Sequence, residues 1–277
     1  MRYAIATFVT DEGIAPDRLA VAVEERGFDS LIVTEHSHMP VAYHEPYAGA
    51  GTPGREYFRT LDPFVVLTAA AAATRNLSLM TGVILLPQRD VLYTAKEVAS
   101  LDLVAQGRFR LGVGVGWNEQ EMRHCGVDPV TRGVKMTEQV RALKQIWTQD
   151  IAEFHGRIVD FAPIYSWPKP VQRPHPPIYV GGGSRAALRR LRDVGDGWLA
   201  PPMPANDIAQ ARQWLADNGR GDIAITLFAA TANPKALVEY AAAGVNESAF
   251  LLPTMPEQDS LRELDRLAEL VTASGEW

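Results

Sequence analysis

The chain reads LMTGVILLP over residues 79–87 and FRLGVGVGWN over residues 109–118, and these two runs decide the fold. Each run predicts a buried β-strand that opens into a loop, and the helical pattern at 90–105 joins them. Gly82 interrupts the first run, where glycine weakens a strand unless a bulge or a close ligand needs the space. The second run lacks side chains along one face, at Gly112, Gly114 and Gly116. Two neighbouring strands with bare faces predict a flat ligand lying against the main chain.

Short apolar runs alternate with helical patterns along the chain. Strands are predicted at 3–9, 29–34, 78–85, 109–115, 177–181, 197–200, 222–229 and 248–252. Helices are predicted at 15–26, 62–75, 90–105, 131–148, 184–194, 205–217, 234–243 and 258–273. Eight strand–helix units in about 250 residues favour an α/β fold, the closed (β/α)8 TIM barrel, and a doubly wound open sheet is the alternative.

Two long segments break this alternation. Residues 36–60 follow the second strand, and residues 150–176 lie between the fourth helix and the fifth strand. Loops of this length in a compact domain are usually functional or disordered, and loops that follow barrel strands form the catalytic face. We therefore expect one domain over residues 1–277, with the loop 36–60 and the inserted arm 150–176 lying over the C-terminal face.

Composition excludes several classes of protein. The net charge of −6 offers no basic footprint for nucleic acid. The apolar runs are too short for a membrane span, and the N-terminus lacks the apolar core of a signal peptide. The single cysteine, Cys125, excludes an intramolecular disulfide and suits a reducing compartment, so we expect a cytoplasmic protein.

The run PIYVGGGS at residues 177–184 predicts a phosphate site. A buried strand opens into Gly181, Gly182 and Gly183, and Ser184 stands at a helix start, where backbone N–H groups attract anions. An ordinary turn with a serine cap is the alternative. A second tight turn, which contains Gly197 and Trp198, follows and strengthens the phosphate interpretation. The spacing matches neither a Walker loop nor a dinucleotide fingerprint.

Glu35 and His36 are the acid–base candidates, because they end the second strand, where catalytic groups of barrels project. The imidazole of His36 can move a proton in either direction. The alternative is a histidine that merely hydrogen-bonds a loop. His38 and His44 lie nearby in the sequence and suggest a metal site as a further alternative, but we do not expect one. Trp117 ends the fourth strand and is predicted to wall the pocket.

The chain resembles the bacterial luciferase-like superfamily. The resemblance rests on GFDSL at 27–31 with Glu35-His36, TGV at 81–83, GRF at 107–109, GVGVGW at 112–117 and GGG at 181–183. Members are TIM-barrel oxidoreductases that use FMN or the deazaflavin coenzyme F420, commonly as homodimers, so the resemblance implies a homodimer here, with the helices at 62–75 and 90–105 as apolar candidates for the interface.

The resemblance also implies roles for individual residues. In this family a bulge in the third strand carries a non-prolyl cis peptide beneath the cofactor ring, and the matching bond is Gly82–Val83, with Thr81 before it. His36 matches the active-site histidine. The cofactor-binding set implied by the bare strands, the phosphate loop and the motifs together is Thr81, Gly82, Val83, Gly114, Trp117, Gly181, Gly182, Gly183, Ser184, Gly197 and Trp198.

The cofactor and substrate follow from the same resemblance. Trp117 stands where the branch that oxidises sugar phosphates has an acidic residue, which argues against that substrate. The GWNE ending of the fourth strand and the WPKP arm are similar to the F420-dependent branch. The resulting prediction is hydride transfer between reduced F420 and a small organic substrate. The alternatives are an FMN-dependent monooxygenase, a member that only stores or senses the cofactor, and a metal hydrolase.

Overall fold

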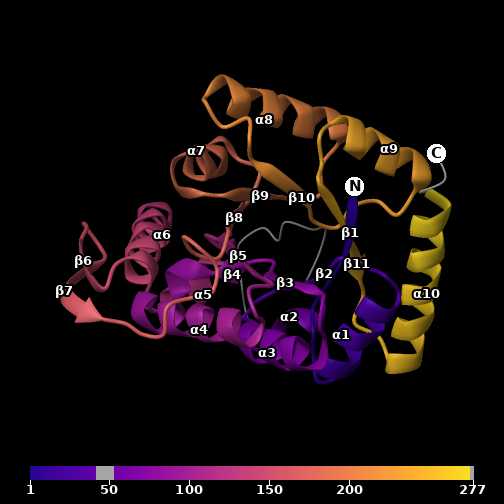
Figure 1. The fold of residues 1–277 in the computed structure, drawn as a ribbon, viewed down its shortest axis with the longest axis horizontal. Helices are drawn as coiled ribbons and strands as arrows, with labels where there is room; N and C mark the ends of the chain where they lie inside the picture. Colours follow the sequence, from indigo (N-terminus) through magenta and orange to yellow (C-terminus); the bar gives the residue numbers. More distant parts are fainter. Residues whose placement is uncertain (42–52, 275–277) are drawn as a thin grey trace.

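The computed structural model describes residues 1–41 and 53–274, and it forms a closed parallel barrel surrounded by helices (Figure 1). The barrel strands are β1 (Arg2–Thr7), β2 (Ser30–Val33), β3 (Ser78–Thr81) with β4 (Ile84–Leu85), β5 (Phe109–Gly114), β8 (Ile178–Gly181), β9 (Gly197–Ala200), β10 (Ala224–Leu227) and β11 (Glu247–Leu252). β1 pairs with both β2 and β11, and β3 and β4 both pair with β5, so the sheet has no open edge. The predicted TIM barrel is confirmed, and the open-sheet alternative is wrong.

The outer helices match the predicted pattern closely. They are α1 (Pro16–Glu25), α3 (Pro63–Ala73), α4 (Val91–Val104), α6 (Arg132–Thr148), α7 (Arg185–Val194), α8 (Ala205–Asp217), α9 (Pro234–Ala242) and α10 (Glu257–Ser274). Three of them begin at side-chain caps, because Asp62, Ser184 and Asn233 accept N–H groups of the first turn. The short helices α2 (Glu56–Arg59) and α5 (Glu119–His124) were not predicted. No helix in the described ranges is long and apolar enough to cross a membrane.

The arm at 150–176 contains an antiparallel hairpin of β6 (Ile151–His155) and β7 (Asp160–Tyr165), which lies outside α6 at the edge of the molecule (Figure 1). The segment after it is held at the ends of α4 and α6. Lys169 donates to the carbonyl oxygens of Ile146 and Gln149 at 2.7 and 2.6 Å, and the Asp102 carboxylate accepts the N–H of Val171 at 2.7 Å.

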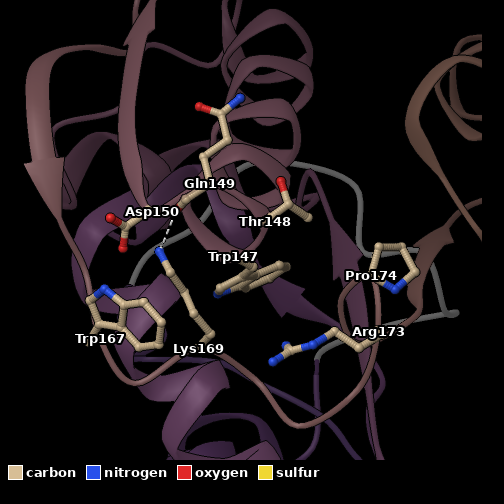
Figure 2. A pocket seen from close by; sticks show the side chains of 8 residues that line it. All are labelled: Trp147, Thr148, Gln149, Asp150, Trp167, Lys169, Arg173 and Pro174. Carbon is tan, nitrogen blue, oxygen red and sulfur yellow. Dashed lines mark hydrogen bonds between the residues drawn. The ribbon is translucent and has the colours of Figure 1, made fainter.

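This placement corrects the prediction that the arm covers the C-terminal face. Outer helices run antiparallel to the strands, so the ends of α4 and α6 lie at the opposite, N-terminal face. The unpaired carbonyl groups at the end of α6 attract the Lys169 ammonium, which fixes the arm there. Figure 2 shows Lys169 beside a surface cavity of about 490 Å³ whose lining includes Trp147, Trp167 and Arg173.

A buried ion pair fills the N-terminal end of the barrel interior. Arg110 of β5 donates to both oxygens of Glu247 of β11, at 2.8 and 3.1 Å. Ser30 and Thr226 donate to the same carboxylate at 2.6 and 2.9 Å. Burial by itself raises the pKa of Glu247, but the charge and hydrogen bonds of Arg110 outweigh burial, and the net pKa lies below its usual value. The pair therefore joins strands from opposite sides of the barrel in its charged form.

We expect Glu247→Gln to lower the free energy of unfolding at pH 7 by about 3–5 kcal/mol, because it leaves the buried Arg110 charge without its partner. A carboxylate with a lowered pKa stabilises the fold above its unfolded pKa of about 4.3, and this contribution is lost as pH falls through the folded pKa. Urea unfolding should therefore show the difference between the variant and the unaltered protein narrowing below about pH 4.3.

Glu263→Gln is the matched control, because Glu263 pairs with the half-exposed Arg266 on the surface of α10. We expect it to change the free energy of unfolding by less than about 1 kcal/mol at pH 7. Equal effects of the two substitutions would contradict a stabilising role for the buried pair.

Candidate active site at the carboxyl end of the barrel

A bulge between β3 and β4 shapes the mouth of the barrel. The Gly82–Val83 peptide bond is cis, as the family resemblance implied. Thr81 fixes the bulge to β5, because its hydroxyl donates to the carbonyl oxygen of Gly112 at 2.8 Å and accepts the Gly112 N–H at 2.9 Å. Its side chain is fully buried by this exchange, so Thr81 holds the bulge in place and does not face a ligand.

The glycines around the bulge are required by the chain itself, which corrects the interpretation that a ligand alone needs the bare strands. A β-carbon on Gly114 would lie 2.5 Å from Cγ2 of Val83, and one on Gly181 would lie 2.8 Å from Cγ1. A β-carbon on Gly82 would overlap the side chain of Ile32. Val83 therefore occupies the space that Gly114 and Gly181 leave, and the half-buried Gly82 and Val83 form the floor of the mouth.

His36 lies beside this floor and is held by a carboxylate that the sequence did not reveal. Its Nδ1 is 3.0 Å from Oε2 of Glu121, and the two side chains are 6% and 0% exposed. Asn118 caps α5 by accepting the Glu121 N–H at 3.1 Å, which sets Glu121 one turn into the helix. Asn118 followed three residues later by Glu121 has the spacing of a helix start, but this spacing does not say which residue the carboxylate binds.

Aromatic rings surround the His36 imidazole. The ring of Trp117 meets it edge-on with centroids 5.9 Å apart. Tyr57 of α2 lies 5.1 Å from the same imidazole and 4.6 Å from Phe8, which follows β1. The described part of the loop 36–60 therefore lies at the C-terminal face, whereas its residues 42–52, including His44, fall outside the described ranges.

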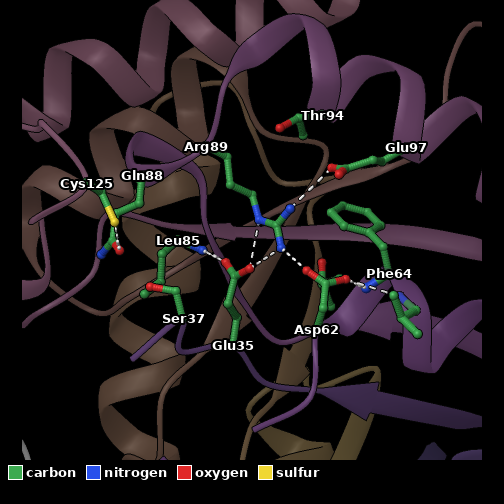
Figure 3. A network of polar contacts seen from close by, with 12 residues as sticks. Glu35, Ser37, Asp62, Phe64, Leu85, Gln88, Arg89, Thr94, Glu97 and Cys125 are labelled. Atoms are coloured by element: carbon green, nitrogen blue, oxygen red, sulfur yellow. Dashed lines mark hydrogen bonds and ion pairs between the residues drawn. The ribbon is translucent and has the colours of Figure 1, made fainter. Parts of the chain in front are cut away.

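Glu35, predicted as an acid–base residue, belongs to an ion-pair network in the structure (Figure 3). Arg89 donates to its Oε1 from two nitrogens, one at 2.7 Å, and the Leu85 N–H donates to its Oε2 at 2.6 Å. Arg89 also donates to Asp62, the cap of α3, at 2.7 Å. Burial lowers the pKa of Arg89, but Glu35 and Asp62 outweigh burial and raise it above its usual value. Glu35 thus anchors the end of β2 and positions the neighbouring His36.

His36 and His38 have different side-chain partners. His38 Nε2 lies 2.8 Å from Nδ1 of His124, and the two imidazole rings are stacked. Within residues 1–41 and 53–274, no group of three or more His, Cys, Asp or Glu side chains is arranged to hold a metal ion.

The loop after β8 presents main chain at the same mouth. Gly182 has a φ of +108°, which favours glycine, and Gly183 and Ser184 are exposed. Ser184 accepts the Ala187 N–H at 3.1 Å as the cap of α7, so the serine cap that sequence left as an alternative is present. The N–H groups of the first helical turn have no acceptor within the helix and remain suited to an anion.

Gly197 and Trp198 lie behind this loop, which corrects their predicted contact with the cofactor. Gly197 begins β9 and so lies toward the N-terminal end of the barrel. A β-carbon there would lie 2.5 Å from the Tyr179 ring. Trp198 is fully buried, and its indole N–H donates to the carbonyl oxygen of Gly182 at 2.8 Å. Trp198 therefore supports the loop after β8 from inside the protein.

Comparison with known proteins agrees with this geometry. The family model of the luciferase-like monooxygenases matches residues 16–275. The chain belongs to the luciferase-like monooxygenase family. It is 36% identical over 277 residues to the uncharacterized protein Rv0953c of Mycobacterium tuberculosis, with 97% of this chain and 98% of that protein covered.

Other known proteins are similar to a shorter stretch of the chain or to its fold. The FMNH(2)-dependent dimethylsulfone monooxygenase of Pseudomonas putida is 38% identical over 134 residues, which cover 47% of this chain and 37% of the enzyme. The monooxygenase RslO1 of Streptomyces bottropensis superposes with a TM-score of 0.77 at 22% identity, covering 99% of each chain. An F420-dependent secondary alcohol dehydrogenase superposes with a TM-score of 0.76 at 16% identity, covering 99% of this chain and 98% of that one.

We expect Gly114→Ala to destabilise this luciferase-like protein by about 1–3 kcal/mol, because the new methyl group would overlap Cγ2 of Val83. Val83→Ala in the same chain removes that overlap, since the next nearest Val83 atom, Cβ, lies 3.4 Å away. A double-mutant cycle by urea unfolding should therefore show the second substitution recovering most of the loss.

Gly13→Ala is the control for this cycle, because its β-carbon would make only ordinary contacts at 3.7 Å. We expect it to change the free energy of unfolding by less than about 0.5 kcal/mol. Strictly additive effects of Gly114→Ala and Val83→Ala would contradict the packing of Val83 against Gly114.

We expect Glu121→Gln to spread the His36 proton over both ring nitrogens, because a neutral amide no longer favours Nδ1–H as a carboxylate does. NMR of protein labelled with ¹⁵N in histidine measures which nitrogen carries the proton. Glu119→Gln is the control on the same helix, since Glu119 pairs with Arg123 and Arg132. An unchanged His36 tautomer in Glu121→Gln would exclude the carboxylate as its determinant.

Proposed function

We propose that this protein is an oxidoreductase that transfers a hydride between the deazaflavin coenzyme F420 and a small organic substrate. The observation that carries the proposal is the His36–Glu121 pair beside the bulge at 81–83. Because a carboxylate only accepts, Nδ1 of His36 carries a proton and the Nε2 of the neutral ring is left to accept one. His36 is thereby suited to take the substrate proton that accompanies hydride transfer.

The residues of the mouth fit the coenzyme. Val83 and Gly82 offer a half-buried apolar floor for a planar ring, and Trp117 offers a wall. The exposed loop of Gly183 and Ser184, together with the first N–H groups of α7, suits a phosphate. The bound coenzyme supplies two-electron hydride chemistry, while the protein holds the ring, excludes water and manages the proton.

F420 is favoured over FMN by the similarity of the fourth-strand ending and the arm to the F420-dependent branch. Two solved structures with the same fold are F420-dependent by name, a secondary alcohol dehydrogenase bound to an F420–acetone adduct and a tetrahydromethanopterin reductase from Methanopyrus kandleri. The second candidate function is an FMN-dependent monooxygenase. It is favoured by the 38% identity with the dimethylsulfone monooxygenase, which extends over about half of this chain.

We also propose that the protein forms a homodimer through α3 and α4. Val65 on α3 and Tyr93 on α4 are 69% and 76% exposed. The two helices pack against each other, so these apolar side chains belong to neighbouring elements of one surface. Large exposed apolar groups on adjacent helices are characteristic of association surfaces.

Separate titrations with F420 and FMN, followed by protein fluorescence, test the choice of cofactor. We expect F420 to bind with a dissociation constant on the order of micromolar and FMN to bind far more weakly. Tight binding of FMN with no binding of F420 would reject the deazaflavin assignment in favour of the monooxygenase.

His36→Ala tests the proton role. We expect the affinity for F420 to stay nearly unchanged, while oxidation of small secondary alcohols, followed by F420 absorbance, slows by ~10²-fold or more. His155→Ala is the control, because this exposed histidine on β6 lies outside the mouth. Turnover of His36→Ala at the rate of the unaltered protein would remove His36 from the reaction.

A further inference from the structure

A continuous series of polar side chains leads from His36 to the protein surface. His36 Nδ1 lies 3.0 Å from Glu121, and the Ser37 hydroxyl lies 3.4 Å from the other oxygen of that carboxylate. The same hydroxyl is 2.9 Å from Nδ1 of His38, whose Nε2 is 2.8 Å from Nδ1 of His124. We call these five residues the polar chain.

Burial changes along the polar chain from one end to the other. The Glu121 side chain is fully buried and that of His36 is 6% exposed, whereas Ser37 and His124 are exposed and His38 is half-buried. A bound substrate over the mouth would separate Nε2 of His36 from water. The opposite nitrogen of the same ring then remains connected to solvent through the polar chain.

Every member of the polar chain can both accept and release a proton. An imidazole does so through its two nitrogens, a serine through its hydroxyl, and a carboxylate through its two oxygens. The longest link, 3.4 Å between Ser37 and Glu121, is a weak hydrogen bond, and the serine hydroxyl can rotate between Glu121 and His38. The Ser37 N–H separately holds the carboxylate at 3.1 Å.

We propose that the polar chain conducts protons between His36 and water while the substrate covers the mouth. This inference rests on the proposed function, because it assigns the route of the proton that His36 handles. Ser37 and His38 are positioning residues in this route, and they do not contact the substrate.

The proton balance is closed without any further reactant. A proton that reaches Nε2 of His36 from the substrate is matched by one that leaves Nδ1 for Glu121. Glu121 takes this proton on Oε2 and, after its carboxyl group rotates, donates it to the Ser37 hydroxyl, which passes its own proton to His38. His38 then passes one proton to His124, and His124 releases one to water. The reverse sequence delivers a proton to a substrate that is being reduced. Each ring resets by exchanging with water, His36 when the mouth is empty.

Hydrogen exchange tests the route without any substrate or cofactor. NMR of protein labelled with ¹⁵N in histidine follows the exchange of the His36 Nδ1 proton with water. We expect Ser37→Ala and His38→Ala each to slow this exchange by about tenfold or more, as for other positioned proton carriers. Ser37→Ala keeps the backbone N–H that holds Glu121, so the His36–Glu121 pair stays in place. Exchange as fast as in the unaltered protein in both variants would overturn the proposal.

Turnover with F420 and small secondary alcohols separates this proposal from the proposed function. We expect His38→Ala to slow turnover about tenfold or more, to raise the solvent deuterium isotope effect, and to recover on addition of imidazole. His155→Ala should do none of these. Loss of turnover in His36→Ala with full turnover in Ser37→Ala and His38→Ala would overturn the polar chain alone. Full turnover in His36→Ala would overturn the proposed function, and slowed exchange would still support the chain.

Discussion

The close approach of the bulge at 81–83 to β5 and β8 is the constraint on which the mouth of the barrel depends. The carbonyl oxygen of Thr81 lies where a β-carbon of Gly112 would be, and the methyl groups of Val83 lie where those of Gly114 and Gly181 would be. Three glycines on two strands are therefore fixed by one short segment of a third strand. The floor of the mouth therefore consists of the Val83 side chain and bare main chain. The packing of Val83 against Gly114 and Gly181 fixes its position.

The two ends of the barrel interior differ in where their polar groups lie. The N-terminal end is closed by Arg110 and Glu247, whose charges are paired and surrounded by hydroxyl groups. Small and apolar side chains such as Ala4, Ala6 and Met80 fill the middle. The C-terminal end keeps its polar groups at the rim, where His36 and the loop after β8 lie. Because the ion pair closes the N-terminal end, the C-terminal end is the one open to a ligand.

The sequence predicted the barrel and most of its elements because their signals are local. Hydrophobic alternation marked the strands, and Asp62, Ser184 and Asn233 marked helix starts at the residues where the structure has them. The Gly82–Val83 bond followed from the family resemblance. His36 and Trp117 were placed at the mouth because both follow the ends of strands.

The errors concern relations between distant segments. Glu121 was missed because nothing near it in the chain indicates that it meets His36, 85 residues earlier. Glu35 was expected to be catalytic because the sequence does not show that it pairs with Arg89, which lies 54 residues later in the chain. Gly197 and Trp198 were assigned to the ligand side because sequence does not tell which end of a strand a residue occupies until its register is known. The position of the arm was predicted wrongly because no sequence motif marks the groups that hold it. These groups are the Asp102 carboxylate and the carbonyl groups at the end of α6.

The position of the β6–β7 hairpin has an evolutionary consequence. Within residues 1–41 and 53–274 its strands pair only with each other, and Glu138 of α6 holds its turn through the N–H groups of Arg157, Ile158 and Val159. Among the described residues, the hairpin forms a two-stranded sheet of its own and adds no strand to the barrel wall. Its length and surface can therefore diverge among homologues while the reaction centre is conserved, which makes this segment the natural place for lineage-specific elaboration.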